Sequence, residues 1–327
     1  MRIRTLLGYC LSGALGLMAG ACSNADNVAI ADARPQLPSD VDARVVVDID
    51  ASPVGASKDA SGADALPGAA DAALIDGAPP SPGGHLLLSE VNADGSPTSD
   101  GAELIEIFNP TAAAIDLTHY YLSDSQQYWQ LAAGPDVSTT SDTIAKFPDG
   151  ASIGPNNALV IALDGADFQT AAPAGFGQKA DFAIANPDGA AAMIVVAGGS
   201  APTITNGGEM VSLFFWDGKS DLVKDVDLVI TGANPSGANG LRKKTADDTV
   251  DGPDPGTEAS AYVDDAGGIE PFSASAGDGK SYQRIAVESA GGEAGSGGNG
   301  IGGHDETTED TSATWTTAAP TPGQTAL

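Results

Sequence analysis

The chain has 327 residues, of which 14 are lysine or arginine and 44 are aspartate or glutamate, so its formal net charge is −30. This charge argues against nucleic acids and anionic lipid surfaces as partners, because proteins that bind phosphate groups gather basic residues to neutralise them. Hydrophobic residues make up 42% of the sequence, which is enough apolar material for one globular core.

The first 21 residues have the features of a secretory signal peptide. Arg2 and Arg4 form a basic start, an uncharged stretch follows, and small residues at 19–21 directly precede Cys22. This arrangement resembles the lipobox of bacterial lipoproteins. The resemblance implies that Cys22 becomes the lipid-modified N-terminus and anchors the protein to a membrane. The alternative is an ordinary signal peptide in which Cys22 has no such role.

The lipobox resemblance implies a location in the bacterial cell envelope. Ser23 follows the cysteine at a place where aspartate would favour retention in the inner membrane, so we expect an outer-membrane lipoprotein that faces the periplasm or the cell surface. Cys10 leaves with the signal peptide, and the mature protein then has no thiol for a disulfide.

Residues 22–84 are predicted to form a disordered tether. They contain ten aspartates, no glutamate and no aromatic residue, and they are rich in alanine, proline, serine and glycine. Such a composition cannot bury enough apolar area to offset the entropy of ordering the chain. The alternative is a short strand or docking segment at Val45, Val46 and Val47.

The globular domain is expected from residue 85 to residue 327. All 16 aromatic residues of the mature chain lie between Phe108 and Trp315. The apolar segments of this region are short and separated by glycine, proline, asparagine and aspartate; they are residues 86–91, 103–109, 114–122, 158–163, 191–196, 210–216 and 222–230. This pattern predicts an all-β sandwich. Segment 210–216 is apolar on both faces and predicts a strand that is central or covered.

Six sequence blocks follow one another along the domain. They are LLLSEVNADG at 86–95, GAELIEIFNPTAAAIDLTHYYLSD at 101–124, FPDGASIGPNNALVIAL at 147–163, NGGEMVSLFFWDG at 206–218, KSYQRI at 280–285 and ATWTTAAPTPG at 313–323. In this order they resemble the lamin tail domain family. The resemblance implies an immunoglobulin-like β-sandwich without catalytic residues of its own. Bacterial relatives often accompany nuclease or phosphoesterase domains, and we find no such domain in this sequence.

The domain is longer than its predicted fold requires. An immunoglobulin-like sandwich needs about 100 residues, and the excess lies in four long polar segments at 125–145, 164–205, 231–279 and 287–311. These segments are either disordered or form loops that build a binding surface. For the glycine-rich stretch 291–303 we expect disorder.

Two short motifs resemble catalytic motifs of other protein families. Residues 150–154 spell GxSxG, the spacing of a hydrolase nucleophile, but Pro155 and a strand-like run follow where that motif needs a helix. Residues 279–281 end like a phosphate-binding loop but lack its first glycine and its helix. We interpret both as turns, and we expect no enzymatic activity.

Calcium is the one candidate cofactor. Asp247, Thr249, Asp251, Gly252 and Glu258 have the spacing of positions 1, 3, 5, 6 and 12 of an EF-hand-like loop, and weak calcium sites are common outside the cell. The candidate metal ligands are therefore the three carboxylates of this set. The alternative is a solvated acidic loop, since prolines stiffen the segment and no helix pair flanks it.

Zinc is less favoured by the sequence than calcium. His85, His119 and His304 are far apart along the chain and none belongs to an HExxH-type motif. We interpret His119, which precedes two tyrosines, as a strand residue.

Aromatic residues are the other candidate binding site. Tyr120, Tyr121, Tyr128 and Trp129 precede an inserted loop, and exposed aromatic rings stack on sugars or anchor protein partners. The alternative is that they fill the core of the sandwich.

The cluster Arg242, Lys243 and Lys244 is the one basic run in an acidic domain, and we expect it to pair with neighbouring acids rather than with nucleic acid.

These features predict a membrane-anchored envelope lipoprotein whose domain binds a protein or glycan partner without catalysis. Two alternatives stay open, a hydrolase that uses an acid pair in the inserted loops and a structural spacer of the envelope. Two carboxylates that converge in a concave pocket and have shifted pKa values would favour the hydrolase interpretation. An exposed apolar patch would favour a binding function.

Overall fold

The structure is a computed structural model that describes residues 84–93, 102–135, 137, 141–170, 176, 178–199, 201–233, 240–272, 274–277 and 279–327. The predicted signal peptide, Cys22 and the predicted tether up to residue 83 lie outside the described residues. In the part that the structure describes, no helix is long and apolar enough to cross a membrane.

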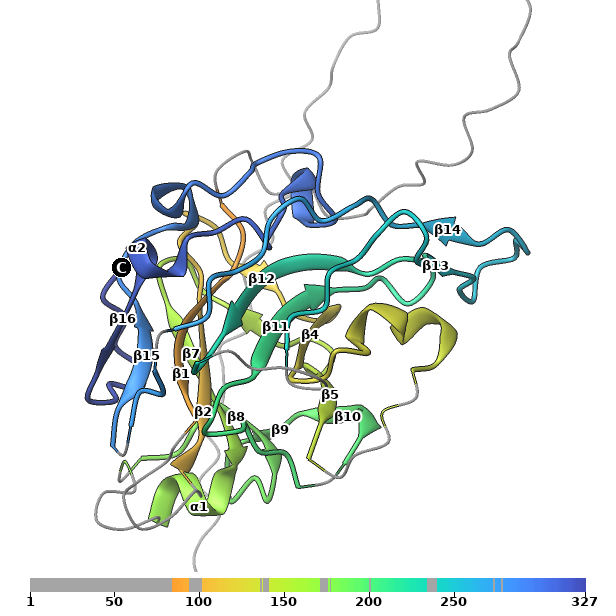
Figure 1. The fold of residues 1–327 in the computed structure, drawn as a ribbon. Helices are drawn as coiled ribbons and strands as arrows, with labels where there is room; N and C mark the ends of the chain where they lie inside the picture. Colours follow the sequence, from red (N-terminus) through yellow and green to blue (C-terminus); the bar gives the residue numbers. More distant parts are fainter. Residues whose placement is uncertain are drawn as a thin grey trace, which may run out of the picture. The chain divides into compact units, whose positions relative to one another are not determined.

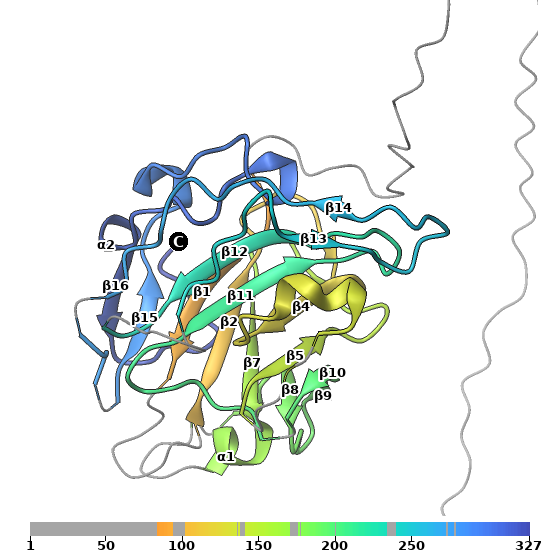
Figure 2. The same cartoon turned by 45° about the vertical axis from the view of Figure 1, so that its right-hand side comes forward.

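Two β-sheets lie face to face and form the body of the domain (Figures 1 and 2). The larger sheet has the strand order β16 (Trp315–Ala318), β15 (Ser281–Arg284), β1 (Leu87–Asn92), β2 (Leu104–Phe108), β7 (Ala158–Asp164), β8 (Phe182–Ala185) and β9 (Ala191–Ala192). The smaller sheet has the order β10 (Ile194–Gly198), β5 (Thr143–Lys146), β4 (Tyr120–Ser123), β11 (Met210–Phe215) and β12 (Lys224–Ile230). This arrangement confirms the predicted immunoglobulin-like β-sandwich.

Most neighbouring strands are antiparallel, and the exceptions are β7 with β8 and β8 with β9. Two short ladders accompany the sheets, β3 (Ile115–Asp116) with β6 (Ser152–Ile153) and β13 (Thr249–Val250) with β14 (Ser260–Ala261). The helical turns are α1 (Gly165–Thr170), α2 (Thr311–Thr314), η2 (Tyr128–Ala133), η4 (Glu288–Gly291) and η5 (Ile301–Gly303).

The main core lies between the two sheets. Leu88 of β1, together with Ile105 and Ile107 of β2, meets Val211 and Leu213 of β11 there. Because side chains alternate between the two faces of a strand, a spacing of two residues places each pair on the same side. The sandwich is therefore held by the apolar alternation that the sequence displays.

Strand β11 is covered on both faces, as its sequence predicts. It lies between β4 and β12 in the smaller sheet. Val211 and Leu213 belong to the main core, whereas Phe214 belongs to a second apolar cluster on the opposite face. The short helix η2 supplies two aromatic residues to that second cluster, so the segment inserted after β4 is a cover for the sheet.

Two predicted strands are divided in the structure. Segment 114–122 becomes β3 and β4, which are separated by a turn. Segment 191–196 becomes β9 and β10, which belong to different sheets, and the buried Met193 lies between them. The chain thus passes from the edge of the larger sheet to the edge of the smaller sheet at this residue.

The glycine-rich stretch 291–303 is ordered, and the prediction of disorder there is wrong. The backbone N–H of Asp305 donates to the carbonyl of Ala294 over 2.8 Å. The Asn299 side chain donates to the Asp265 carboxylate over 2.6 Å. Hydrogen bonds to residues outside the stretch, together with the packing of Ile301 against the main core, hold this stretch in place.

Two buried glutamates on neighbouring strands hold the C-terminal segment. Glu90 of β1 faces Glu106 of β2 across the ladder. Glu90 accepts a hydrogen bond from the Thr321 N–H over 3.0 Å, and Glu106 accepts one from the Gly323 N–H over 2.6 Å. Burial raises the pKa of Glu106 to about 7, although the hydrogen bonds from Ser89 and Gly323 act in the opposite direction. The strand glutamates and the terminal Thr-Pro-Gly segment of the sequence blocks are thus in direct contact.

Candidate functional site

The four aromatic residues predicted as a binding surface lie in the interior. Tyr120, Tyr121, Tyr128 and Trp129 are each between 0% and 7% exposed. Tyr121 stacks on Phe214 with 5.2 Å between ring centroids. The structure supports the core alternative and corrects the expectation of a sugar- or protein-binding surface at these residues, because burial removes their ring faces from solvent.

The segment predicted to bind calcium is a β-hairpin. Strands β13 and β14 pair in it, so Thr249 lies opposite Ala261 in a ladder rather than in a loop that wraps an ion. Asp247, Asp251 and Glu258 are all exposed. Among the described residues, the groups whose ligand atoms are close enough to hold a metal include neither Asp247 nor Glu258. The ladder therefore corrects the EF-hand-like interpretation.

Asp251 instead lies near Asp221 and Asp254, with one oxygen of each within 4.8 Å of the others. Asp221 already accepts hydrogen bonds from the Gly252 N–H over 2.9 Å and from the Ser260 hydroxyl over 2.6 Å. These bonds give Asp221 a structural role, which is to attach the hairpin to the segment before β12.

Each of the two motifs that resemble catalytic motifs begins in a turn, as predicted, and continues into a strand. Ser152 lies in β6, and strand β7 follows where a nucleophile elbow would have a helix. Ser281 begins β15. Neither serine has the strand-to-helix setting that its look-alike motif requires.

Two of the three residues of the basic cluster, Arg242 and Lys244, pair with neighbouring acids, as predicted, and Lys243 is exposed. Arg242 forms an ion pair with Asp248. Lys244 is 1% exposed, donates to Asp225 over 2.5 Å and lies 3.7 Å from Asp265. Its charge is therefore compensated inside the domain and is not available to a nucleic acid.

Strand β10 presents an apolar edge to solvent. Ile194 is 45% exposed, Val195 39% and Val196 42%. The strand lies at the end of the smaller sheet and pairs with β5 on one side. Its sequence has neither the charges nor the prolines that protect sheet edges from pairing. Strand β12, at the opposite edge of the sheet, has a backbone hydrogen bond on its outer side. There the Asp225 N–H donates to the Asn299 carbonyl over 3.2 Å.

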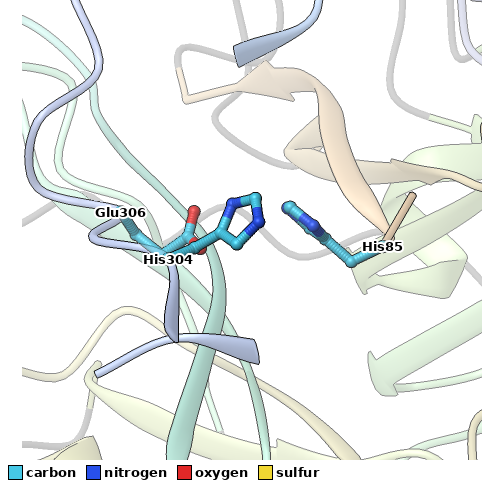
Figure 3. A group of neighbouring side chains, drawn as sticks. All are labelled: His85, His304 and Glu306. Carbon is cyan, nitrogen blue, oxygen red and sulfur yellow. The ribbon is translucent and has the colours of Figure 1, made fainter. Parts of the chain in front are cut away.

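Two histidines from opposite ends of the domain meet beside the start of β1 (Figure 3). His85 lies two residues before β1, and His304 follows η5. Their ring centroids are 5.0 Å apart, with the rings at 81°. One nitrogen of each ring and one oxygen of Glu306 lie within 4.8 Å of one another. The structure thus brings together residues that the sequence analysis set aside as too far apart for a zinc site.

Two further glutamates complete this group. Glu288 Oε2 lies 2.9 Å from His85 Nε2, and Glu293 Oε1 lies 2.9 Å from His304 Nδ1. We call these four residues together with Glu306 the histidine–glutamate cluster.

The histidine–glutamate cluster contains three carboxyl groups and two imidazoles, and its neighbouring cation is already paired with other carboxylates. The neighbouring guanidinium of Arg284 pairs with Asp227 over 2.8 Å and with Glu309 over 2.6 Å. Burial raises the pKa of Glu306 well above its usual range, and nearby carboxylates raise it further. Burial lowers the pKa of His85, which favours its neutral imidazole.

Residues 79–224 match the model of the family described as Lamin Tail Domain. The chain carries a lamin tail domain. A crystal structure of a DUF4876 family protein from Bacteroides thetaiotaomicron is similar over 72% of this chain and 72% of that chain, with 17% sequence identity and a TM-score of 0.44. A search of curated proteins finds no match.

Strand β10 and the histidine–glutamate cluster are the two candidate sites, and they differ in their position relative to the residues that match the lamin tail domain. Strand β10 lies within the matched residues. Of the histidine–glutamate cluster, His85 lies within them, whereas Glu288, Glu293, His304 and Glu306 follow them. The cluster is thus built where the segment beyond the family match returns to the first strand of the lamin tail domain.

Sequence reasoning missed both sites for different reasons. The spacing of His85 and His304 carries no signal, because only the topology of the sheet brings them together. The sequence of residues 194–196 did carry a signal for an exposed apolar surface. Its three consecutive apolar residues do not alternate with polar residues, as they would in a half-buried strand.

Proposed function

We propose that this protein is a non-catalytic lipoprotein of the bacterial cell envelope whose lamin tail domain binds a protein partner. The lipobox-like sequence before Cys22 supports the membrane anchor. The composition of residues 22–84 supports a tether that gives the domain reach from the membrane.

The exposed apolar edge of β10 is the observation that carries the proposal. An extended segment of a partner can add to a free sheet edge, where backbone hydrogen bonds give affinity and alternate side chains give specificity. Ile194, Val195 and Val196 place apolar contact area beside that edge. A protein is favoured over a glycan because the aromatic rings that would stack on a sugar are buried.

Site-specific photo-cross-linking in intact cells tests the partner. A cross-linking amino acid at Val195 is expected to give a protein adduct, and a Val196→Lys substitution in the same chain is expected to abolish it, because an edge lysine opposes strand addition. Val263 is 45% exposed but lies outside β10, so it is the matched control position. Equal adducts at both positions would contradict the proposal, and an adduct of two copies of this chain would identify self-association instead.

Cell fractionation tests the anchor. The native chain is expected in the membrane fraction, and the Cys22→Ala variant is expected in the soluble fraction because it lacks the residue that would carry the lipid. A Cys22→Ala variant that stays with the membrane would contradict a lipid anchor at this cysteine.

The hydrolase alternative has less support than binding. The facing carboxylates Glu90 and Glu106 have raised pKa values, as an acid pair would, but both accept hydrogen bonds from the C-terminal segment. A purely structural spacer is the interpretation that remains if no adduct forms at Val195.

A further inference from the structure

Three residues of the histidine–glutamate cluster have ligand atoms close enough to share one metal ion. A nitrogen of His85, a nitrogen of His304 and an oxygen of Glu306 lie within 4.8 Å of one another. Glu288 oxygens lie within the same distance of His304 and of Glu306, and one is 2.9 Å from His85. In a tetrahedral site with metal–ligand bonds of about 2.1 Å, ligand atoms are about 3.4 Å apart. Side-chain movements of roughly 1 Å would therefore bring His85, His304 and Glu306 to a common ion.

One histidine of the cluster is already oriented as a metal ligand would be. Metal-bound histidines usually hold their second ring nitrogen against a carboxylate or carbonyl, which fixes the tautomer and the ring. Glu293 Oε1 is 2.9 Å from Nδ1 of His304, and the Glu293 side chain is 3% exposed. Gly295 and Gly302 flank the Nε2 side of the ring, where Cβ atoms would lie 3.9 and 4.0 Å from this nitrogen. A side chain at either position would be in van der Waals contact with this nitrogen.

Three buried polar atoms in the cluster have no hydrogen-bond partner. They are Nε2 of His85, Oε1 of Glu288 and Oε1 of Glu306. The three residues are 6%, 5% and 3% exposed. The 2.9 Å contact between His85 and Glu288 is an ion-pair distance without the alignment of a hydrogen bond. Buried polar atoms in native proteins are almost always satisfied, so three unsatisfied atoms within one side-chain cluster indicate a ligand.

The charge of the cluster points to a cation. Two other buried carboxylates have a basic partner, since Asp225 has Lys244 and Asp227 has Arg284. Glu90 and Glu106 accept hydrogen bonds from the C-terminal segment. Glu306 instead lies within 4.8 Å of two other carboxylates. Buried charges of one sign are costly unless an opposite charge compensates them. Among the described contacts of Glu306, no basic side chain balances its negative charge. A divalent cation would balance it.

We propose that His85, His304 and Glu306 bind one divalent transition-metal ion of the zinc class, with Glu288 beside His85 and Glu293 as a positioning residue for His304. Two imidazole nitrogens favour zinc over calcium, which takes six to eight oxygen ligands. The ion fastens the first residues of the sandwich to the loop after β15. In secreted domains a disulfide often does this, but residues 84–327 contain no cysteine.

The first test measures metal binding to the full chain after treatment with a chelator. Zinc is expected to bind at one ion per chain and, at 100 times its dissociation constant, to raise the melting temperature by about 5 to 10 °C. Cobalt(II) is expected to give visible absorption bands of a four-coordinate nitrogen–oxygen site. Zinc should displace the cobalt and calcium should not.

Variants then assign the site. Glu306→Gln keeps the side-chain shape and removes a buried charge, so the metal-free variant is expected to fold and to lose at least about ten-fold in zinc affinity. His304→Ala is expected to lose at least as much. His119→Ala is the matched control, because His119 is exposed and lies outside the cluster; its zinc affinity should equal that of the native chain.

Several results would overturn the proposal. One is a zinc stoichiometry near zero. Another is a zinc affinity that Glu306→Gln leaves unchanged, and this result counts even if His304→Ala fails to fold. An equal loss in His119→Ala would assign zinc to the general surface, and displacement of cobalt by calcium would assign an oxygen-ligand site.

Discussion

Arg284 is a single buried side chain that joins four parts of the domain. Its Nε donates to the Leu88 carbonyl of β1 over 2.7 Å, and its terminal nitrogens pair with Asp227 of β12 and with Glu309. Its guanidinium also lies 4.7 Å from the ring centroid of Trp315. Removal of this cation leaves two buried carboxylates without a counter-charge.

Substitution of Arg284 is therefore expected to be costly. Arg284→Met should lower the free energy of unfolding by about 3 to 5 kcal/mol, as measured by urea denaturation, because Asp227 and Glu309 stay buried without their partner. Arg242→Met is the matched control. Arg242 also lies 4.7 Å from a tryptophan ring and pairs with an aspartate, but its side chain is 32% exposed, so the loss should be about 1 kcal/mol. Equal losses would contradict the role of burial.

At the scale of the element, the strands could be predicted from sequence because their signal is local. Runs such as Leu87–Asn92 and Met210–Phe215 carry β-branched and aromatic residues between turn residues, and they form strands close to their expected limits. The division of segment 191–196 between two sheets could not be predicted, because the run of apolar residues continues through the crossing at Met193.

The candidate sites could not be predicted in the same way, because they depend on contacts between distant residues. The order of stretch 291–303 comes from partners such as Asp265, and a glycine-rich composition gives no indication of them. His85 and His304 are neighbours in a fold in which β15 returns to pair with β1. Nor does composition show which side of a strand Tyr121 occupies, so its burial could not be told from exposure.

The double cover of β11 makes a prediction about two adjacent residues. Phe214 is fully buried in the second apolar cluster between Tyr121 and Tyr128, so Phe214→Ala should lower the free energy of unfolding by about 3 to 5 kcal/mol. Phe215 is only partly buried, and Phe215→Ala should cost clearly less in the same denaturation experiment. A larger loss at Phe215 would show that the outer face of β11 is not covered as described.

At the scale of the whole molecule, buried carboxylates make stability depend on pH. Burial raises the pKa of Glu106 and of Glu209 from 4.5 to about 7. Between these values the folded state holds more protons than the unfolded state, so the free energy of unfolding falls as pH rises through about 7. His85 acts in the opposite direction, since burial lowers its pKa, but more carboxylates than histidines are shifted.

The metal-free chain is therefore expected to melt at a higher temperature at pH 5 than at pH 8. The raised pKa of Glu106 and that of Glu209 each correspond to about 3 kcal/mol in the free energy of unfolding between acidic and alkaline pH. Glu106→Gln mimics the protonated carboxyl and should reduce the difference between the two melting temperatures. A melting temperature that is equal or higher at pH 8 in the presence of chelator would contradict this account of the buried acids.

The central claim is that an extended segment of a protein partner pairs with the edge of β10. Hydrogen–deuterium exchange of residues 194–198, in the free chain and in the complex isolated through the Val195 cross-link, tests it most directly. The β10 amides that do not bond to β5 are expected to become protected in the complex, while the hairpin of β13 and β14 exchanges as before. Unchanged exchange in β10, with protection on another surface, would contradict it.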